Sequence, residues 1–203
     1  MEKKTVRDIN VKGKKVLVRV DYNVPMNDKG EITDTIRIDA TLPTLNYLLD
    51  QGAAIILMAH LGRPKGKVVP SMSLKPCAEY LSQVMKKEVK FAPDCIGPEA
   101  TEAARELQPG EILMLENLRF HPEEEKNDMA FAASLASLAD IYVNNGFGVS
   151  HRAHASVEGV AHYLPAVSGF LLEKEIKYLG NAVDHPVRPF AATVSYTHLR
   201  AHE

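Results

Sequence analysis

Short runs of apolar residues alternate along this chain with segments in which apolar residues recur every three or four positions. The runs are rich in β-branched residues, as is typical of buried strands. They predict strands at Lys15–Val20, Ala53–Ala59, Glu88–Phe91, Ile112–Leu115 and Ile141–Val143.

The segments between these runs have the periodicity of amphipathic helices. Pro43 is expected in the first turn of the first helix, and Gly52 is a natural C-cap for it. Four helices are expected: one carrying Ile38, Leu42, Leu45 and Leu49, one capped by Ser73, one opened by Pro98, and one marked by Phe131, Leu135 and Leu138. Strand–helix–strand order with short links favours parallel pairing and right-handed crossovers. The pattern therefore predicts a doubly wound, mostly parallel α/β fold, Rossmann-like, with helices on both faces.

The alternation of apolar runs and helical segments ends at about Ala161. Residues 169–180 predict a long helix with Leu171, Leu172 and Ile176 on one stripe. A proline-rich stretch at 185–189 then leads into one further strand at 190–194. A parallel strand without a following crossover has no partner within its own unit. The chain is therefore expected to stop just inside a second domain.

Composition narrows the class of protein. The 203 residues are 45% apolar and 25% charged, which is typical of globular domains. The net charge of −2 argues against a general nucleic-acid binder. Apolar runs are too short to span a bilayer, the first residues show no signal-peptide pattern, and Cys77 and Cys95 are expected to be free thiols. We expect a cytoplasmic protein.

Charged and polar side chains follow four of the predicted strands. In open parallel sheets, ligands bind beyond the carboxyl ends of the strands, where these loops meet. The loops carry Asp21 and Asn23, His60 and Arg63, Arg119, and His151 and Arg152, and Arg37 lies at a helix entrance. Guanidinium groups hold phosphate or carboxylate with two hydrogen bonds and stay charged. The sequence therefore predicts an anion site at this edge.

Other interpretations have less support. The segment 62–67 lacks the spacing of a phosphate loop, and no dinucleotide fingerprint or serine-hydrolase elbow occurs. His151, His154 and His162 could be read as metal ligands, but no carboxylate or cysteine stands at the expected spacing, so no metal is predicted. Asp21 is open to two interpretations: a general base, or an aspartate that caps its own loop.

Five motifs, in order, resemble the N-terminal domain of the phosphoglycerate kinase family, and the likeness runs from about residue 5 to about 193. They are V-R-V-D-Y-N-V-P (18–25), I-R-I (36–38), H-L-G-R-P (60–64), L-E-N-L-R-F (115–120) and H-R-A-H-A (151–155). The resemblance implies reversible phosphoryl transfer between 1,3-bisphosphoglycerate and ADP, giving 3-phosphoglycerate and Mg-ATP. It also implies two domains, the first for the phosphoglycerate and the second for the nucleotide.

The resemblance also implies residue roles and boundaries. Arg37 corresponds to the arginine that stabilises the transferring phosphoryl group. Substrate-binding positions are Asp21, Tyr22, Asn23, Arg37, His60, Leu61, Gly62, Arg63, Arg119, His151 and Arg152. The expected division is a phosphoglycerate-binding domain at 1–166, an interdomain helix and linker at 167–188, the first strand of a nucleotide domain at 189–194, and a foreign tail at 195–203.

Two departures from the family pattern change the expectation. Asn145 and Gly146 replace an aspartate and an alanine, which puts the rigidity of that loop in question. The expected glycine- and lysine-containing nucleotide segment after residue 194 is replaced by an unrelated sequence. The chain is thus expected to be monomeric, to bind no Mg-nucleotide and to be inactive alone. The alternative is a non-catalytic module that binds an anionic metabolite.

Overall fold

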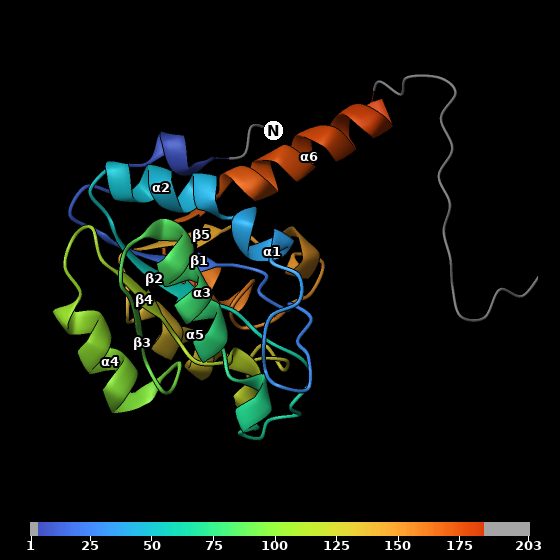
Figure 1. Ribbon diagram of the computed structural model, residues 1–203. Helices are drawn as coiled ribbons and strands as arrows, with labels where there is room; N and C mark the ends of the chain where they lie inside the picture. The colour runs from blue at the N-terminus through green and yellow to red at the C-terminus, as the bar shows by residue number, and fades with distance from the viewer. Residues whose placement is uncertain (1–3, 185–203) are drawn as a thin grey trace, which may run out of the picture.

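The computed structural model describes residues 4–184, and its centre is one six-stranded sheet (Figure 1). The strands are β1 (Lys15–Arg19), β2 (Ala54–Met58), β3 (Val89–Phe91), β4 (Ile112–Met114), β5 (Ile141–Asn144) and β6 (Ala166–Ser168). Their order is β3-β4-β2-β1-β5-β6, and every neighbouring pair is parallel. The predicted parallel α/β class is confirmed.

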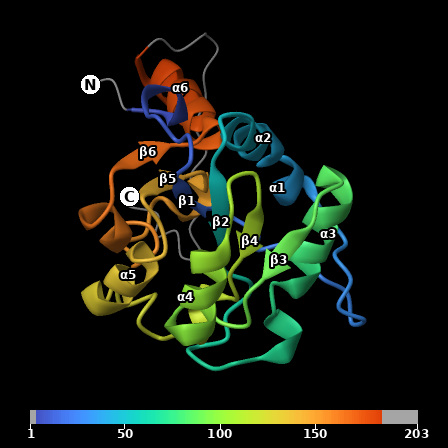
Figure 2. The ribbon, with the colours of Figure 1, turned by 90° about the vertical axis from the view of Figure 1, so that its left-hand side faces the viewer.

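Helices connect the strands and cover both faces of the sheet. They are α1 (Ile36–Asp39), α2 (Leu42–Asp50), α3 (Lys75–Met85), α4 (Gly97–Glu106), α5 (Met129–Ala136) and α6 (Phe170–Asp184). Short 3₁₀ helices are η1 (Val6–Asp8), η2 (Pro70–Met72), η3 (Leu118–Phe120), η4 (Phe147–Val149) and η5 (Gly159–His162). Figure 2 shows α4 and α5 on one side of the strands and α2 and α3 on the other.

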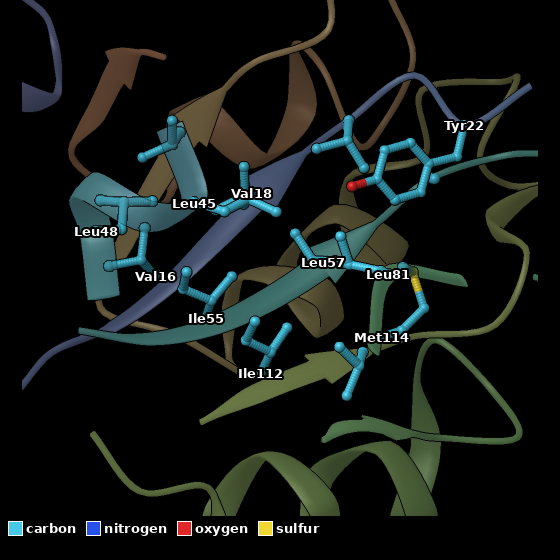
Figure 3. Close-up of a cluster of buried hydrophobic side chains, with 14 of the residues drawn as sticks. Val16, Val18, Tyr22, Leu45, Leu48, Ile55, Leu57, Leu81, Ile112 and Met114 are labelled. Carbon is cyan, nitrogen blue, oxygen red and sulfur yellow. The ribbon is translucent and has the colours of Figure 1, made fainter. Parts of the chain in front are cut away.

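Alternation along the strands divides the core into two layers. Val16 and Val18 of β1 face α2 and α3 and join Leu45 and Leu81 there (Figure 3). Leu17, between them in sequence, belongs to the opposite layer with side chains of α4 and α5. Because both faces are covered, the strands read as continuous apolar runs rather than alternating ones.

The first predicted helix is divided into α1 and α2. The Thr41 amide bonds to Ile38 O at 3.0 Å, and α2 restarts with Thr41 as its N-cap. Pro43 has no N–H to donate to the preceding turn, so the hydrogen-bond ladder stops there. Pro43 lies in the first turn of α2, as predicted.

Helix α3 begins one residue later than the sequence suggested. Leu74 is its N-cap, and Ser73 accepts a hydrogen bond from the Lys75 amide at 3.2 Å. The Leu74 amide is instead satisfied by the carboxylate of Glu116, at 2.9 Å. Ser73 thus keeps a hydrogen bond to the first turn of α3, and Glu116, from the loop after β4, satisfies the amide before it.

Strand β6 is the element that periodicity did not reveal. It has three residues, pairs with β5, and is bridged by Thr5 at the start of the chain. It straddles residue 166, where the first domain was expected to end. Helix α6 follows at once and begins one residue after the start of the predicted helix at 169–180. The expectations for 189–194 and 195–203 lie outside the described residues. Within residues 4–184, no helix is long and apolar enough to cross a membrane.

Candidate anion-binding site

The loops after β1, β2, β4 and β5 meet at the carboxyl edge of the sheet. The chain leaves β1 toward the layer of α2 and leaves β5 toward the layer of η5, so the two connections diverge. Diverging connections open a crevice between neighbouring strand ends, and this is where open α/β sheets bind ligands. The loops that carry the predicted polar side chains therefore lie at the edge where open α/β sheets bind ligands.

Gly62 joins three of these loops. Its amide donates to Asn23 Oδ1 at 2.8 Å, and its carbonyl accepts from Arg119 Nη1 at 3.0 Å. Its φ is +65°, and a Cβ there would lie 2.9 Å from the Met72 sulfur. The backbone angle favours glycine, and a Cβ would also require the Met72 side chain to shift. Gly62 is thus a structural link between the loops after β1, β2 and β4.

Arg119 is held almost completely inside the site. Its side chain is 5% exposed, and its Nε lies 3.3 Å from Glu125 Oε1 without aligning for a hydrogen bond. Burial lowers the pKa of its guanidinium, the Glu125 carboxylate raises it, and the nearby Arg152 and Arg19 lower it. The guanidinium is therefore fixed in a region of excess positive charge.

Asn117 supports Arg119, although the sequence analysis did not single it out. Its Oδ1 accepts from the Arg119 amide at 3.1 Å. Its Nδ2 donates to the carbonyls of Leu61 and Met72, at 2.8 and 2.9 Å. The residue was visible in the L-E-N-L-R-F motif, but its role depends on contacts between distant loops.

His60 lies at the centre of the cationic groups and is 5% exposed. Its Nδ1 lies 3.0 Å from Nη2 of Arg19. Burial lowers its pKa to about 2, with further lowering by Arg19, Arg119 and Arg152. His60 is therefore neutral at physiological pH and contributes hydrogen bonding rather than charge.

Arg19 is a second residue that the sequence analysis missed. It is fully buried at the end of β1, where its Nε donates to Ser156 Oγ at 2.8 Å. Ser156 in turn donates to the buried carboxylate of Glu124 at 2.6 Å. Nothing in a hydrophobic strand pattern indicates that its last residue is a buried arginine with a partner 137 positions away.

Arg37 and Asp21 form an ion pair, with Nη1 and Oδ2 2.6 Å apart. The Arg37 side chain remains 51% exposed, so its other nitrogens face solvent. Asp21 Oδ1 accepts from the Asn23 amide at 3.3 Å, which is the loop-capping contact considered above. Gly148 approaches so closely that a Cβ would lie 2.6 Å from Asp21 Oδ2, which brings the loop after β5 against the loop after β1.

Arg63, His151 and Arg152 are exposed at the same edge. Arg152 Nε donates to His151 Nε2 at 3.1 Å. The described part of the chain offers no ion pair or hydrogen bond to the Arg63 side chain. Exposed guanidinium groups with donors to spare suit an anion that arrives from solvent.

Two of the predicted substrate-binding residues have side chains that lie in the core instead. Tyr22 is fully buried, and its hydroxyl lies 2.8 Å from Thr41 Oγ1. Leu61 is 5% exposed and belongs to the same core layer. Tyr22 and Leu61 can therefore contact a ligand only through their backbone atoms, because their side chains are packed in the core.

The histidines weighed as metal ligands do not converge. His154 Nδ1 lies 3.8 Å from Glu124, whereas His162 pairs with Glu158 at 2.5 Å. Within residues 4–184, the donor atoms that do converge, within 4.8 Å, belong to Asp94, Cys95 and His121.

That trio is occupied by its own contacts. Asp94 Oδ1 lies 2.6 Å from His121 Nε2 and also accepts the Cys95 amide. Burial raises the pKa of the Cys95 thiol, which keeps its proton on. The arrangement is accounted for by hydrogen bonding and packing.

Asn145, one of the departures from the family pattern, anchors α6. Its buried Oδ1 accepts from Thr44 Oγ1 at 3.0 Å and from the Leu171 amide at 3.1 Å. A Cβ on Gly169 would lie 2.2 Å from this oxygen. The Asn145 Nδ2 has no partner, so the amide satisfies its acceptor but not its donor.

Comparison with known proteins agrees with this geometry. A family model described as phosphoglycerate kinase matches residues 6–198. Curated phosphoglycerate kinases from Moorella thermoacetica and Chlorobium phaeobacteroides are 59% and 57% identical over 194 and 193 residues, covering 96% and 95% of this chain and 49% of each relative. The chain thus spans about half the length of the relatives it matches.

Solved structures show the same likeness. The phosphoglycerate kinase of Coxiella burnetii superposes with a TM-score of 0.82 at 34% identity, covering 93% of this chain and 47% of that one. That of Pyrococcus horikoshii OT3 gives 0.83 at 35% identity, covering 91% and 47%.

Proposed function

This chain belongs to the phosphoglycerate kinase family, and on that premise we propose that its carboxyl-edge site binds 3-phosphoglycerate or 1,3-bisphosphoglycerate. In this proposal the chain supplies the substrate half of the reversible phosphoryl transfer to ADP. Mg-ADP and Mg-ATP are assigned to a further domain, as the resemblance implies. We further propose a cytoplasmic, monomeric protein.

One observation carries the proposal: the cations at this edge repel one another. Burial is the main cause of the lowered pKa values of Arg119 and His60, and the nearby arginine charges lower both further. The fold therefore brings several positive charges together. Glu124 and Glu125 are the negative charges near Arg119. An arriving phosphate and carboxylate would relieve this repulsion, which supports an anionic ligand over a neutral one.

The individual contacts suggest a division of roles. Arg63, Arg119 and Arg152 are proposed to hold the phosphate and carboxylate, since a planar fork matches both groups. Asp21 and Asn23 are proposed to orient the glycerate part through its hydroxyl group.

Arg37 is proposed to stabilise the phosphoryl group in transfer. Its exposed nitrogens face solvent, while Asp21 holds it at 2.6 Å. Such transfer depends on positioning and on stabilising charge at the phosphoryl oxygens. Because the second substrate must approach in line, we place this chemistry at the open side of the site.

Isothermal titration with 3-phosphoglycerate tests the binding role. Arg63→Lys, Arg119→Lys and Arg152→Lys keep the charge but lose the fork, so each should weaken binding by about 1–3 kcal/mol. Arg105→Lys is the matched control: it changes an exposed arginine whose carbonyl contacts Lys15, at the opposite end of β1. Unchanged dissociation constants in all three site variants would contradict the proposed binding role of these arginines.

A further inference from the structure

Arg19 cannot touch a ligand, although it belongs to the cationic cluster. Its side chain is fully buried, and each of its three nitrogens has an acceptor within the protein. Nε donates to Ser156 Oγ, Nη1 donates to the Val20 carbonyl, and Nη2 lies 3.0 Å from His60 Nδ1. Any effect of Arg19 on the site must therefore pass through one of these neighbours.

The hydrogen bonds on one side of Arg19 have a fixed direction. Arginine only donates, so Ser156 Oγ must accept from it. The Ser156 hydroxyl proton is then directed to Glu124 Oε1 at 2.6 Å, and the Ser156 amide donates to Glu124 Oε2 at 2.9 Å. Glu124 is fully buried and raises the pKa of Arg19. The carboxylate thus neutralises and orients the guanidinium through one serine.

The same reasoning fixes the proton on His60. Because Arg19 Nη2 must donate, Nδ1 of His60 must carry a lone pair. A neutral imidazole then carries its proton on Nε2. Charged and titratable groups on every side favour the neutral ring: Arg19, Arg119, Arg152 and His154 all disfavour a second proton.

The Nε2 atom of His60 is the open end of this chain of contacts. Within residues 4–184 it has no hydrogen-bond partner, and it is not fully buried. It therefore reaches solvent, with Arg119 and Arg152 close enough for both charges to act on the ring. We propose that Arg19 is a positioning residue that holds His60 as the Nε2–H tautomer, so that His60 meets the anion as a neutral hydrogen-bond donor.

This inference rests on the proposed function only for the identity of the anion. The opposite tautomer would present a lone pair to the phosphoglycerate, and two acceptors would then face each other. An unpaired or opposed polar group of this kind has a substantial cost. Arg19, Ser156 and Glu124 together exclude that arrangement, while a histidine without them would populate both tautomers.

The tautomer can be observed directly by two-bond ¹H–¹⁵N correlation spectra of the ¹⁵N-labelled chain, with His60→Gln used for assignment. The expected spectrum shows His60 neutral between pH 5 and 8, with the proton on Nε2. A wild-type His60 that carries its proton on Nδ1, or that titrates to the imidazolium in this range, overturns the inference even where 3-phosphoglycerate binds.

Arg19→Lys tests the positioning role. Lysine keeps the charge but lacks the rigid planar group whose Nε and Nη2 donate to Ser156 and His60 in fixed directions. The Nδ1–H tautomer should therefore appear, and 3-phosphoglycerate should bind about tenfold more weakly. In a His60→Gln background the same change should add little, because its effect passes through His60. Additive losses in this double-mutant cycle contradict the proposal.

Ser156→Ala is the second variant, for the case in which Arg19→Lys does not fold. It removes the acceptor of Arg19 Nε and should shift the same tautomer signal, by a smaller amount. An unchanged tautomer in Ser156→Ala together with an unchanged one in folded Arg19→Lys counts against the role of Arg19. If the Nε2–H tautomer is present but 3-phosphoglycerate does not bind, the proposed function fails and the positioning of His60 stands.

Discussion

At the scale of single residues, the site combines cations that differ in their access to solvent. Arg119 is enclosed, Arg19 is fully buried, and Arg63 and Arg152 are exposed. The sequence could predict that arginines follow the strands, because strand ends are readable from periodicity. It could not rank their burial, since Asn117 ties the loop of Arg119 to carbonyls of a distant loop, and Glu124 acts on Arg19 through Ser156.

The protonation of His60 predicts how stability depends on pH. The unfolded chain protonates this histidine near its ordinary pKa of 6.5, whereas the folded pKa is lowered to about 2. Below pH 6.5 the unfolded state binds more protons than the folded state, so the free energy of unfolding falls as the pH falls. The full contribution of the neutral His60 to stability is present only above pH 6.5. The expected slope from His60 is about 1 kcal/mol per pH unit. The lowered pKa of His154 adds in the same direction.

Urea denaturation between pH 7 and pH 5 measures this slope. His60→Gln removes the titrating group, so its unfolding free energy should fall less steeply over the same range. Parallel curves for the two proteins would mean that His60 is not held neutral by the fold.

Arg37 is expected to matter for transfer more than for binding. In a protein that joins this chain to a nucleotide-binding domain, Arg37→Ala should lower kcat strongly and change the affinity for 3-phosphoglycerate less. The reason is that its exposed nitrogens face the solvent side of the site, where the second substrate would approach. Near-normal turnover in steady-state assays would assign the phosphoryl group to another arginine.

At the scale of elements, five of the six strands were predictable and the last one was not. Strands β1, β2, β3, β4 and β5 lie where the apolar runs predicted them, because buried strand residues leave a continuous apolar signal. Strand β6 has the sequence A-V-S, which contains no apolar run, and it is held in place by pairing with Thr5 and β5. The division between α1 and α2 follows from Pro43, which interrupts the helical hydrogen bonds. The apolar periodicity runs through this break and therefore did not predict it.

The junction between β5 and α6 gives a prediction at this scale. Gly169→Ala places a Cβ 2.2 Å from the Oδ1 of Asn145, which is fully buried and cannot move aside. Thermal and urea unfolding should show a loss of about 1–3 kcal/mol. The residue has an ordinary backbone angle, so the loss is one of packing.

Gly180→Ala, within α6, is the control for this substitution. A Cβ at that position meets nothing within 4 Å, and alanine favours a helix over glycine by up to about 1 kcal/mol. Stability should therefore rise slightly. If both variants changed stability alike, the close approach between Asn145 and Gly169 would be contradicted.

At the scale of the whole molecule, a parallel sheet delivers separate loops to one edge, and Gly62 and Gly148 allow them to meet. The fold class could be predicted from the order and spacing of the elements, and so could the sheet edge at which the polar loops meet. The buried connections that orient the site could not, since Arg19 and Ser156 are 137 positions apart and no local pattern joins them.

The chemical-shift titration of the 203-residue chain with 3-phosphoglycerate tests the central claim most directly, with Mg-ADP as the comparison. The account predicts saturable shifts at Asn23, Gly62 and Arg119, weakened by added salt because exposed arginines are screened. Mg-ADP should give no saturable shifts there. Absence of saturation with 3-phosphoglycerate, or saturation confined to residues away from the carboxyl edge, would contradict the account.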